Sequence, residues 1–159
     1  MLKQENQINS HLLNWYSKHK RDLPWRMLYE NNLPNPYYVF VSEYMLQQTT
    51  VNTVIKRFNE FVIKWPNLER LANATEPQIL KFWSGLGYYS RARNLLKAAK
   101  LIKKNFKSNI PHSYNDLITL PGIGDYTAKA ILGIAFNKPV MPADANIERI
   151  LVRLFAIEK

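Results

Sequence analysis

The chain has 159 residues and a formal net charge of +10, and this length fits one domain with a sizeable core. The excess of lysine and arginine favours a polyanionic partner, although a basic proteome would give the same composition. Cysteine is absent, which excludes disulfides, thiolate zinc sites and cysteine-ligated iron–sulfur clusters within these residues. Without an apolar signal core or a run of 18 apolar residues, we expect a cytoplasmic, nucleoid-associated protein with no membrane contact.

Helical periodicity predicts an all-α fold, because no stretch keeps a two-residue alternation of apolar and polar residues. Apolar positions at helical spacing favour helices over 4–18, 38–48 and 51–65, and prolines interrupt the segment from 19 to 36. Further helices are predicted to follow N-caps at Thr75, Ser90 and Ser113, to begin at about Thr127, and to begin near Asp144. With no repeat or linker, 1–159 is predicted to be a single helical domain.

The turn at Leu120–Gly124 is the most informative local motif, because two glycines flank Ile123. Glycine allows backbone conformations that other residues resist. The amides of Gly122 and Gly124 would point outward at the start of the next helix, where the helix dipole favours an anion. The turn is therefore predicted to hold a phosphate without reading sequence. The acid downstream of it, Asp144, suggests chemistry on the polymer that is held.

Two carboxylates are candidates for that chemistry. Glu43 lies among apolar residues on a predicted helix, so it is either buried, which would raise the pKa of its carboxyl group, or on the one polar stripe of that helix. Asp144 precedes a predicted helix and, by itself, is more typical of an N-cap than of a catalyst. Two carboxylates in different environments can cleave a glycosidic bond, since one donates a proton and the other stabilises the cationic sugar.

If the leaving group is a base of DNA, the nucleotide must be flipped out of the duplex and the gap filled. Candidate side chains at predicted helix breaks are Gln47, Gln48, Thr49, Tyr88 and Tyr89. The same positions also suit polar helix ends and core aromatics. Arg91 and Arg93 follow closely, and this pair could hold a phosphate or simply be solvated.

Five segments of the chain, taken together, carry a resemblance to a known family. They are Leu23–Arg26, Ser42–Thr49, Gly85–Asn94, Leu120–Ala128 and Asp144–Arg149. In order and spacing they resemble the helix-hairpin-helix/Gly-Pro-Asp superfamily of DNA glycosylases and, more narrowly, the MutY-type adenine DNA glycosylases. The similarity extends from about Leu12 onward, and several motifs in one order are stronger than a hairpin alone. The resemblance implies the six-helix module of these enzymes.

The resemblance implies an enzyme that removes adenine mispaired with 8-oxoguanine or guanine in double-stranded DNA. Glu43 would protonate the departing adenine and help to activate water. Asp144 would stabilise the oxocarbenium-like sugar, Asn146 would support the site, and Tyr126 would line it. These four residues are the catalytic set that the resemblance implies.

Other positions would bind the base or the DNA. Trp25 and Arg26 would belong to the base pocket, while Gln48 and Tyr88 would fill the duplex. The expected DNA-binding residues are Gln47, Gln48, Thr49, Tyr88, Arg91, Arg93, Leu120, Gly122, Ile123 and Gly124. In the family the Leu120–Gly124 turn binds backbone phosphate with a monovalent cation on its carbonyl groups. No other metal is expected in this chain, and the protein is expected to be a monomer.

Tyr126 distinguishes between the relatives. In the endonuclease III type, which this chain resembles less closely, that position is a lysine that forms a Schiff base and nicks the strand. A tyrosine has no amine for that reaction, and Lys129 lies one helical turn away from the position. The sequence therefore predicts base removal without efficient strand cleavage.

The sequence also departs from the family. Members normally continue with helices that pack against the N-terminal helix, four cysteines that bind an iron–sulfur cluster, and usually a domain that senses 8-oxoguanine. We therefore expect most of the iron–sulfur domain to be absent after Lys159 and the apolar face of 1–20 to be exposed, with reduced stability. Ala145 replaces a glycine that is usual there. Two functions stay open: an active monofunctional adenine glycosylase, and an inactive, truncated remnant that binds DNA.

Overall fold

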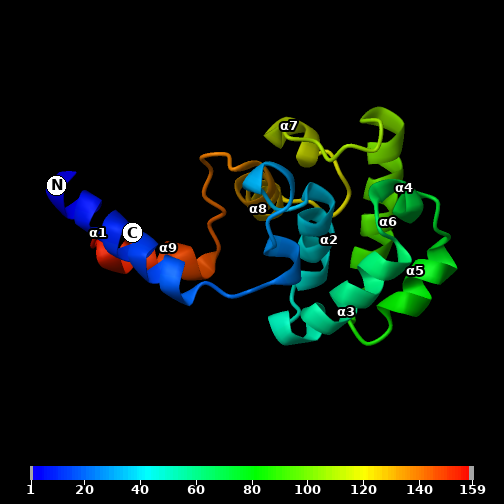
Figure 1. Cartoon of the computed structure of the whole chain (residues 1–159), viewed down its shortest axis with the longest axis horizontal. Helices are drawn as coiled ribbons and strands as arrows, with labels where there is room; N and C mark the ends of the chain where they lie inside the picture. Colours follow the sequence, from blue (N-terminus) through cyan, green and yellow to red (C-terminus); the bar gives the residue numbers. More distant parts are fainter. Residues whose placement is uncertain (1, 158–159) are drawn as a thin grey trace.

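The computed structural model describes residues 2–157, and helices account for its regular structure (Figure 1). The longer helices are α1 (Leu2–His19), α2 (Pro36–Leu46), α3 (Val51–Lys64), α5 (Glu76–Trp83), α6 (Tyr89–Asn105), α8 (Asp125–Phe136) and α9 (Ala145–Leu154). The shorter ones are η1 (Pro24–Arg26), η2 (Glu30–Asn32), α4 (Leu68–Ala72) and α7 (Tyr114–Leu117). Within residues 2–157 a single β-bridge joins Leu28 to Pro34. The prediction of an all-α fold is confirmed.

Helix α2 differs from its predicted bounds at both ends. It starts at Pro36 because the side chain of Asn35 accepts hydrogen bonds from the amides of Tyr37 and Tyr38, at 2.9 and 3.4 Å, and proline suits the first helical position. It ends at Leu46 because Gln47 has a non-helical ψ of 108°, and Gln48 then takes a left-handed backbone conformation, with φ of 56°. The proline-broken loop is thus shorter than the sequence indicated, and Gln47 and Gln48 lie outside the helix.

Two other helices differ from the sequence prediction. The helix predicted to follow Ser90 begins at Tyr89, and its N-cap is Tyr88, because Tyr88 has a left-handed backbone with φ of 46°. Helix α4 was not predicted, since its five residues are too few to show a period. Asn67 caps it by accepting from the amide of Arg70 at 3.0 Å, which is the signal that could have identified it.

Helix α2 lies at the centre of the core and packs against α3, α6 and α8. Apart from its ends, nearly all of its side chains are buried, which explains why its sequence is apolar on every side. Aromatic residues fill the space around it, as where Phe40 meets the Tyr44 ring edge-on at 5.2 Å. A buried central helix holds the residues that follow it, including the Gln47–Thr49 turn, in a defined place.

Helices α1 and α9 extend to one side of the molecule, away from α4, α5 and α6, and both chain ends lie there (Figure 1). Many of their large apolar side chains are exposed, including Leu12, Leu13, Trp15, Ile150 and Leu154, as is Phe155 directly after α9. The predicted exposure of the apolar face of the N-terminal helix is therefore confirmed. None of the helices described between residues 2 and 157 combines the length and the apolar character needed to cross a membrane.

Candidate active site

A pocket of about 640 Å³ lies between the end of α2, the start of α8 and the start of α9. Five of its lining side chains belong to the expected catalytic set or base pocket: Trp25, Arg26, Glu43, Tyr126 and Asp144. Gln47, Gln48 and Thr49 line the same pocket. The fold thus brings together two carboxylates that are separated by a hundred residues in the chain.

Glu43 projects from α2 and is 7% exposed. Burial raises the pKa of its carboxyl group to about 7, and the positive charge of Arg26 opposes that rise. Of the two alternatives left open by the sequence, burial is confirmed. A carboxyl group with this pKa carries a proton in a large fraction of molecules near neutral pH, as a general acid must.

Asp144 is the N-cap of α9. Its Oδ1 accepts hydrogen bonds from the amides of Ile147 at 2.8 Å and Asn146 at 3.0 Å, so the ordinary capping role is real. These amides, led by that of Ile147, lower the pKa of the Asp144 carboxyl group, which keeps it ionised. Asp144 can have both roles, because the carboxylate that caps α9 also lines the pocket.

The other two members of the expected catalytic set differ in position. Tyr126 lines the pocket, and after burial, the charges of Glu43 and Asp144 raise the pKa of its hydroxyl group. The tyrosine therefore lies close to both acids. Asn146 is exposed outside the lining, where its Oδ1 accepts from Arg149 at 2.9 Å. The backbone amide of Asn146 donates a hydrogen bond to Oδ1 of Asp144 at 3.0 Å, which links Asn146 to the pocket.

The Leu120–Gly124 turn is held by one side chain from α2 and one from the residue that follows it. The hydroxyl group of Tyr44 donates to the carbonyl of Pro121 at 2.5 Å, and the side-chain amide of Gln47 donates to the carbonyl of Gly122 at 3.0 Å. Gly122 has φ of +81°, and a Cβ there would lie 2.9 Å from Cβ of Asn94 and 3.0 Å from the Tyr44 ring. Both the backbone conformation and the close packing therefore require glycine.

Three expected DNA-binding residues take internal roles in this turn. The side chains of Leu120 and Ile123 are 3% and 6% exposed, so these two residues can present only backbone groups to a ligand. Gln47 uses its side-chain amide to hold Gly122. The turn itself leads directly into α8, whose N-cap is Gly124, so its amides lie at the positive end of a helix dipole as expected.

Gln48 and Tyr88 share an unusual feature. Both are exposed, and both have a left-handed backbone, with φ of 56° and 46°. Residues other than glycine rarely adopt this conformation, and it is concentrated at functional sites. Each side chain projects from a loop that separates two helices, α2 from α3 and α5 from α6.

Arg91 does not lie on the surface, contrary to both alternatives that the sequence left open. Its side chain is 6% exposed, and its guanidinium group donates to backbone carbonyls such as those of Met45 and Leu86, both at 2.8 Å. It is therefore neither a solvated residue nor a surface ligand for phosphate. Arg93 is half-exposed and pairs with Glu76 at 2.8 Å. The sequence shows only that arginine occurs at position 91, because its partners Tyr44, Met45, Gln47 and Thr49 lie more than 40 residues away.

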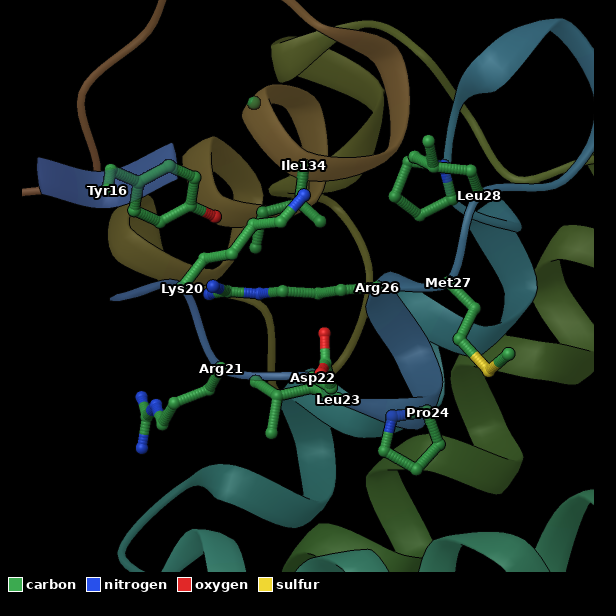
Figure 2. A pocket seen from close by; sticks show the side chains of 12 residues that line it. Tyr16, Lys20, Arg21, Asp22, Leu23, Pro24, Arg26, Met27, Leu28 and Ile134 are labelled. Atoms are coloured by element: carbon green, nitrogen blue, oxygen red, sulfur yellow. The ribbon is translucent and has the colours of Figure 1, made fainter. Parts of the chain in front are cut away.

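A second hollow of about 690 Å³ adjoins the pocket and shares Arg21, Leu23, Arg26 and Ile134 with it. The side chains of Lys20 and Arg26 extend across it, with Met27 and Leu28 at its edge (Figure 2). Neither Glu43 nor Asp144 lines this hollow, so the smaller pocket is the candidate active site. Arg21 and Pro142 also line the pocket and lie outside the five motif segments, while Thr127 and Ile147 lie within two of those segments but were not among the candidate site residues.

Comparison with known proteins gives consistent results along the chain. The family model described as "HhH-GPD superfamily base excision DNA repair protein" matches residues 41–159. The chain is 45% identical over 147 residues to an adenine DNA glycosylase of Buchnera aphidicola subsp. Baizongia pistaciae (strain Bp), covering 92% of this chain and 40% of that protein. It is 43% identical over 150 residues to an adenine DNA glycosylase of Homo sapiens, covering 92% of this chain and 28% of that one.

Solved structures share the fold. A thermostable thymine-DNA glycosylase superposes with a TM-score of 0.83 at 27% identity, covering 94% of this chain and 67% of that one. A trapped endonuclease III–DNA covalent intermediate superposes with a TM-score of 0.81 at 20% identity, which supports the fold alone. The chain spans less than half of the length of the curated relatives above. Because the family model matches most of its residues, the chain belongs to the HhH-GPD superfamily of base excision DNA repair proteins.

Proposed function

We propose that this chain carries the catalytic site of an adenine DNA glycosylase, which hydrolyses the N-glycosidic bond of adenine mispaired with 8-oxoguanine or guanine. The observation that carries the proposal is one pocket lined by a carboxyl group with a pKa of about 7, Glu43, and by an ionised carboxylate, Asp144. The curated relatives named adenine DNA glycosylase supply the identity of the base.

The two acids would divide the reaction between them. Protonated Glu43 would donate its proton to a ring nitrogen of adenine as the bond from the base to C1′ breaks, which turns the base into a neutral leaving group. The anionic Asp144 would stabilise the positive charge that develops on the sugar. Glu43, now ionised, would then take a proton from the water that attacks C1′. Arg26 lies near Glu43 and would stabilise that ionised form.

Strand cleavage by an amine is not part of this proposal. Tyr126 occupies the position where the family's strand-nicking members carry lysine. Lys129 donates to Asp125 at 2.9 Å, and this hydrogen bond raises the pKa of its ammonium group. An ammonium group held in this way is not a nucleophile. The proposal is therefore a monofunctional glycosylase.

The resemblance implies two bound groups, a monovalent cation and an iron–sulfur cluster, and the residues of this chain fit only the cation. The carbonyl oxygens of the Leu120–Gly124 turn are hard, uncharged donors that suit a monovalent cation, which would add positive charge where a phosphate approaches. The iron–sulfur cluster does not fit, because these 159 residues contain no cysteine. Among the residues that the structure describes, no group of three acidic, histidine or cysteine side chains could hold a metal ion. No step above depends on either group.

A single-turnover assay of adenine release tests the proposal. We expect the protein to release adenine from duplexes in which it lies opposite 8-oxoguanine or guanine, and not from adenine–thymine pairs. Binding of the mispaired duplex without release would favour the DNA-binding remnant. Failure to bind any duplex would contradict both functions.

The product should be an intact strand with an abasic site. Because Tyr126 replaces the lysine of the strand-nicking type, we expect cleavage at that site only after alkali treatment. Gel electrophoresis of reactions with and without alkali measures this directly. Efficient nicking without alkali, or trapping of the protein on DNA by borohydride, would contradict the monofunctional assignment.

DNA affinity should fall steeply as salt rises. If backbone phosphates are bound by the turn and by the basic surface, cations are released on binding, and affinity should drop by at least about tenfold between 50 and 200 mM salt. Fluorescence anisotropy of a labelled undamaged duplex measures this slope. An affinity that is independent of salt would argue against the phosphate-binding role of the Leu120–Gly124 turn.

A further inference from the structure

The guanidinium group of Arg91 caps the C-terminal end of helix α2. Its Nη1 donates to the carbonyl oxygens of Tyr44 at 3.3 Å, of Met45 at 2.8 Å, and of Gln47. Carbonyls in the last turn of a helix lack partners within it and form the negative end of the helix dipole, so a buried cation suits them. One nitrogen therefore fixes the backbone immediately before Gln48.

The second terminal nitrogen of the same group, Nη2, donates hydrogen bonds to the loop that contains Gln48 and to the loop that contains Tyr88. It donates to the carbonyl oxygens of Leu86 at 2.8 Å and Gly87 at 3.2 Å, immediately before Tyr88. It also donates to the hydroxyl group of Thr49 at 3.0 Å, immediately after Gln48. Because a guanidinium group is rigid and planar, its two nitrogens keep these loops at a constant separation.

Both loops contain a conformation that needs support. The left-handed backbones of Gln48 and Tyr88, with φ of 56° and 46°, are unfavourable for residues with a Cβ and persist where neighbouring groups over-determine them. The guanidinium of Arg91 also lies 5.6 Å from the centre of the Tyr88 ring and 5.7 Å from that of Trp83. One buried side chain thus contacts residues in both loops.

We propose that Arg91 is a positioning residue that locks the loop 47–50 to the loop 84–88, so that Gln48 and Tyr88 enter a DNA duplex together. The lock is a property of the free protein. Its effect on DNA rests on the proposed function, in which both side chains fill the gap left by a flipped nucleotide. Without the Arg91 guanidinium group, each loop would relax independently, and the side chains of Gln48 and Tyr88 would have to be ordered again when DNA binds.

Hydrogen exchange in the free protein tests the lock without DNA. In Arg91→Lys, the ammonium group has three donors on one nitrogen and cannot span both loops. We expect the amides of Thr49 and Leu86, which donate to the carbonyls of Leu46 at 3.2 Å and Trp83 at 3.0 Å, to exchange at least about tenfold faster in the variant. Unchanged exchange in either loop would overturn the proposal.

A second arginine provides a matched comparison. Arg57 donates to the carbonyl of Ser84 and pairs with Glu60 at 3.1 Å, so it supports only one of the two loops. In Arg57→Lys we expect faster exchange for the amide of Leu86 and unchanged exchange for that of Thr49. If Arg57→Lys released both loops as Arg91→Lys does, the coupling could not be assigned to Arg91.

Base unstacking tests the consequence for function. With 2-aminopurine in place of the target adenine, wild-type protein should raise the fluorescence, and Arg91→Lys should lose most of that rise. Adenine release should fall by about 100-fold, while affinity for an undamaged duplex should change less than about threefold, since phosphate contacts are retained. Ile79→Val removes one buried methyl group outside the site and controls for lost stability.

The outcomes separate the two proposals. If the wild-type protein does not raise the fluorescence, the proposed function fails, and hydrogen exchange still decides the lock. If Arg91→Lys unstacks the base as well as wild type, the role of Arg91 in base flipping is overturned. Equal losses in Arg91→Lys and Ile79→Val at matched stability would reduce Arg91 to an ordinary structural residue, which also overturns it.

Discussion

Glu43→Gln should bind duplex DNA with nearly wild-type affinity and release adenine at least about a thousandfold more slowly, which is within the range for loss of a general acid. The amide has almost the same shape as the carboxyl group and cannot donate a proton to the leaving base. Single-turnover release and anisotropy measure the two effects. Glu60→Gln, which changes an exposed carboxylate, is the matched control. Unchanged release in Glu43→Gln would remove Glu43 from its role.

The same substitution should stabilise the protein at high pH. Burial raises the pKa of Glu43 from 4.5 to about 7, so the folded state binds this proton more tightly than the unfolded state does. The wild-type protein therefore loses stability as pH rises from about 4.5 to about 7, by about 3 kcal/mol in total. Glutamine does not ionise and should avoid that loss. Urea unfolding of both proteins at about pH 4 and about pH 8 measures the difference.

The rate of adenine release should also depend on the ionisation of Glu43. It should fall as pH rises, whereas a reaction that uses a carboxylate as a base would become faster. The protonated form of Glu43 is the active acid, so release should decline as pH rises through about 7. Because the charge of Arg26 opposes the rise in that pKa, Arg26→Met should move the decline to higher pH. A decline that does not move in the variant would show that Arg26 does not act on Glu43.

Gly122→Ala should destabilise the fold by about 2–4 kcal/mol. The residue has φ of +81°, and the new Cβ would lie 2.9 Å from Cβ of Asn94. Neither neighbour can move away easily, since that Cβ belongs to α6 and the Tyr44 ring is held by its hydrogen bond to Pro121. Urea unfolding should show the loss, together with a loss of DNA binding.

Gly124→Ala separates binding from stability at the same turn. No atom lies within 4 Å of a Cβ at this position, and φ is −98°, so alanine should change the free energy of unfolding by less than about 1 kcal/mol. The added methyl group would stand where a phosphate approaches the amides of the turn, and DNA affinity should fall. If both variants lost stability equally, the backbone argument for Gly122 would be wrong.

Local signals in the sequence were sufficient for most helix positions and insufficient at the irregular ends. The α3 bounds differ from the prediction by one residue, because its apolar period is strong. The N-cap of α6 was predicted at Ser90, but it is Tyr88, whose left-handed backbone no local pattern in the sequence indicates. Short α4 has too few residues for a period, and only the cap at Asn67 marks it.

Side-chain roles were less predictable than their positions. Arg91 was expected on the surface, and its carbonyl partners at and just after the end of α2 lie 44 to 47 residues away in sequence. Gln47 was expected to contact DNA, and its side-chain amide donates a hydrogen bond to the carbonyl of Gly122, 75 residues away. A hydrogen bond of this kind forms because α2 packs against α8. No local pattern in the sequence predicts that packing.

By itself, the sequence determined the helical fold, the glycine turn and the identity of the residues at the candidate site, because periodicity, capping and backbone freedom are properties of neighbouring residues. The tertiary structure alone decided what those residues do. It placed Glu43 and Asp144 at one pocket and gave them opposite pKa shifts. Desolvation and hydrogen bonds to backbone amides cause those shifts, and the burial of Glu43 arises only when distant segments pack together.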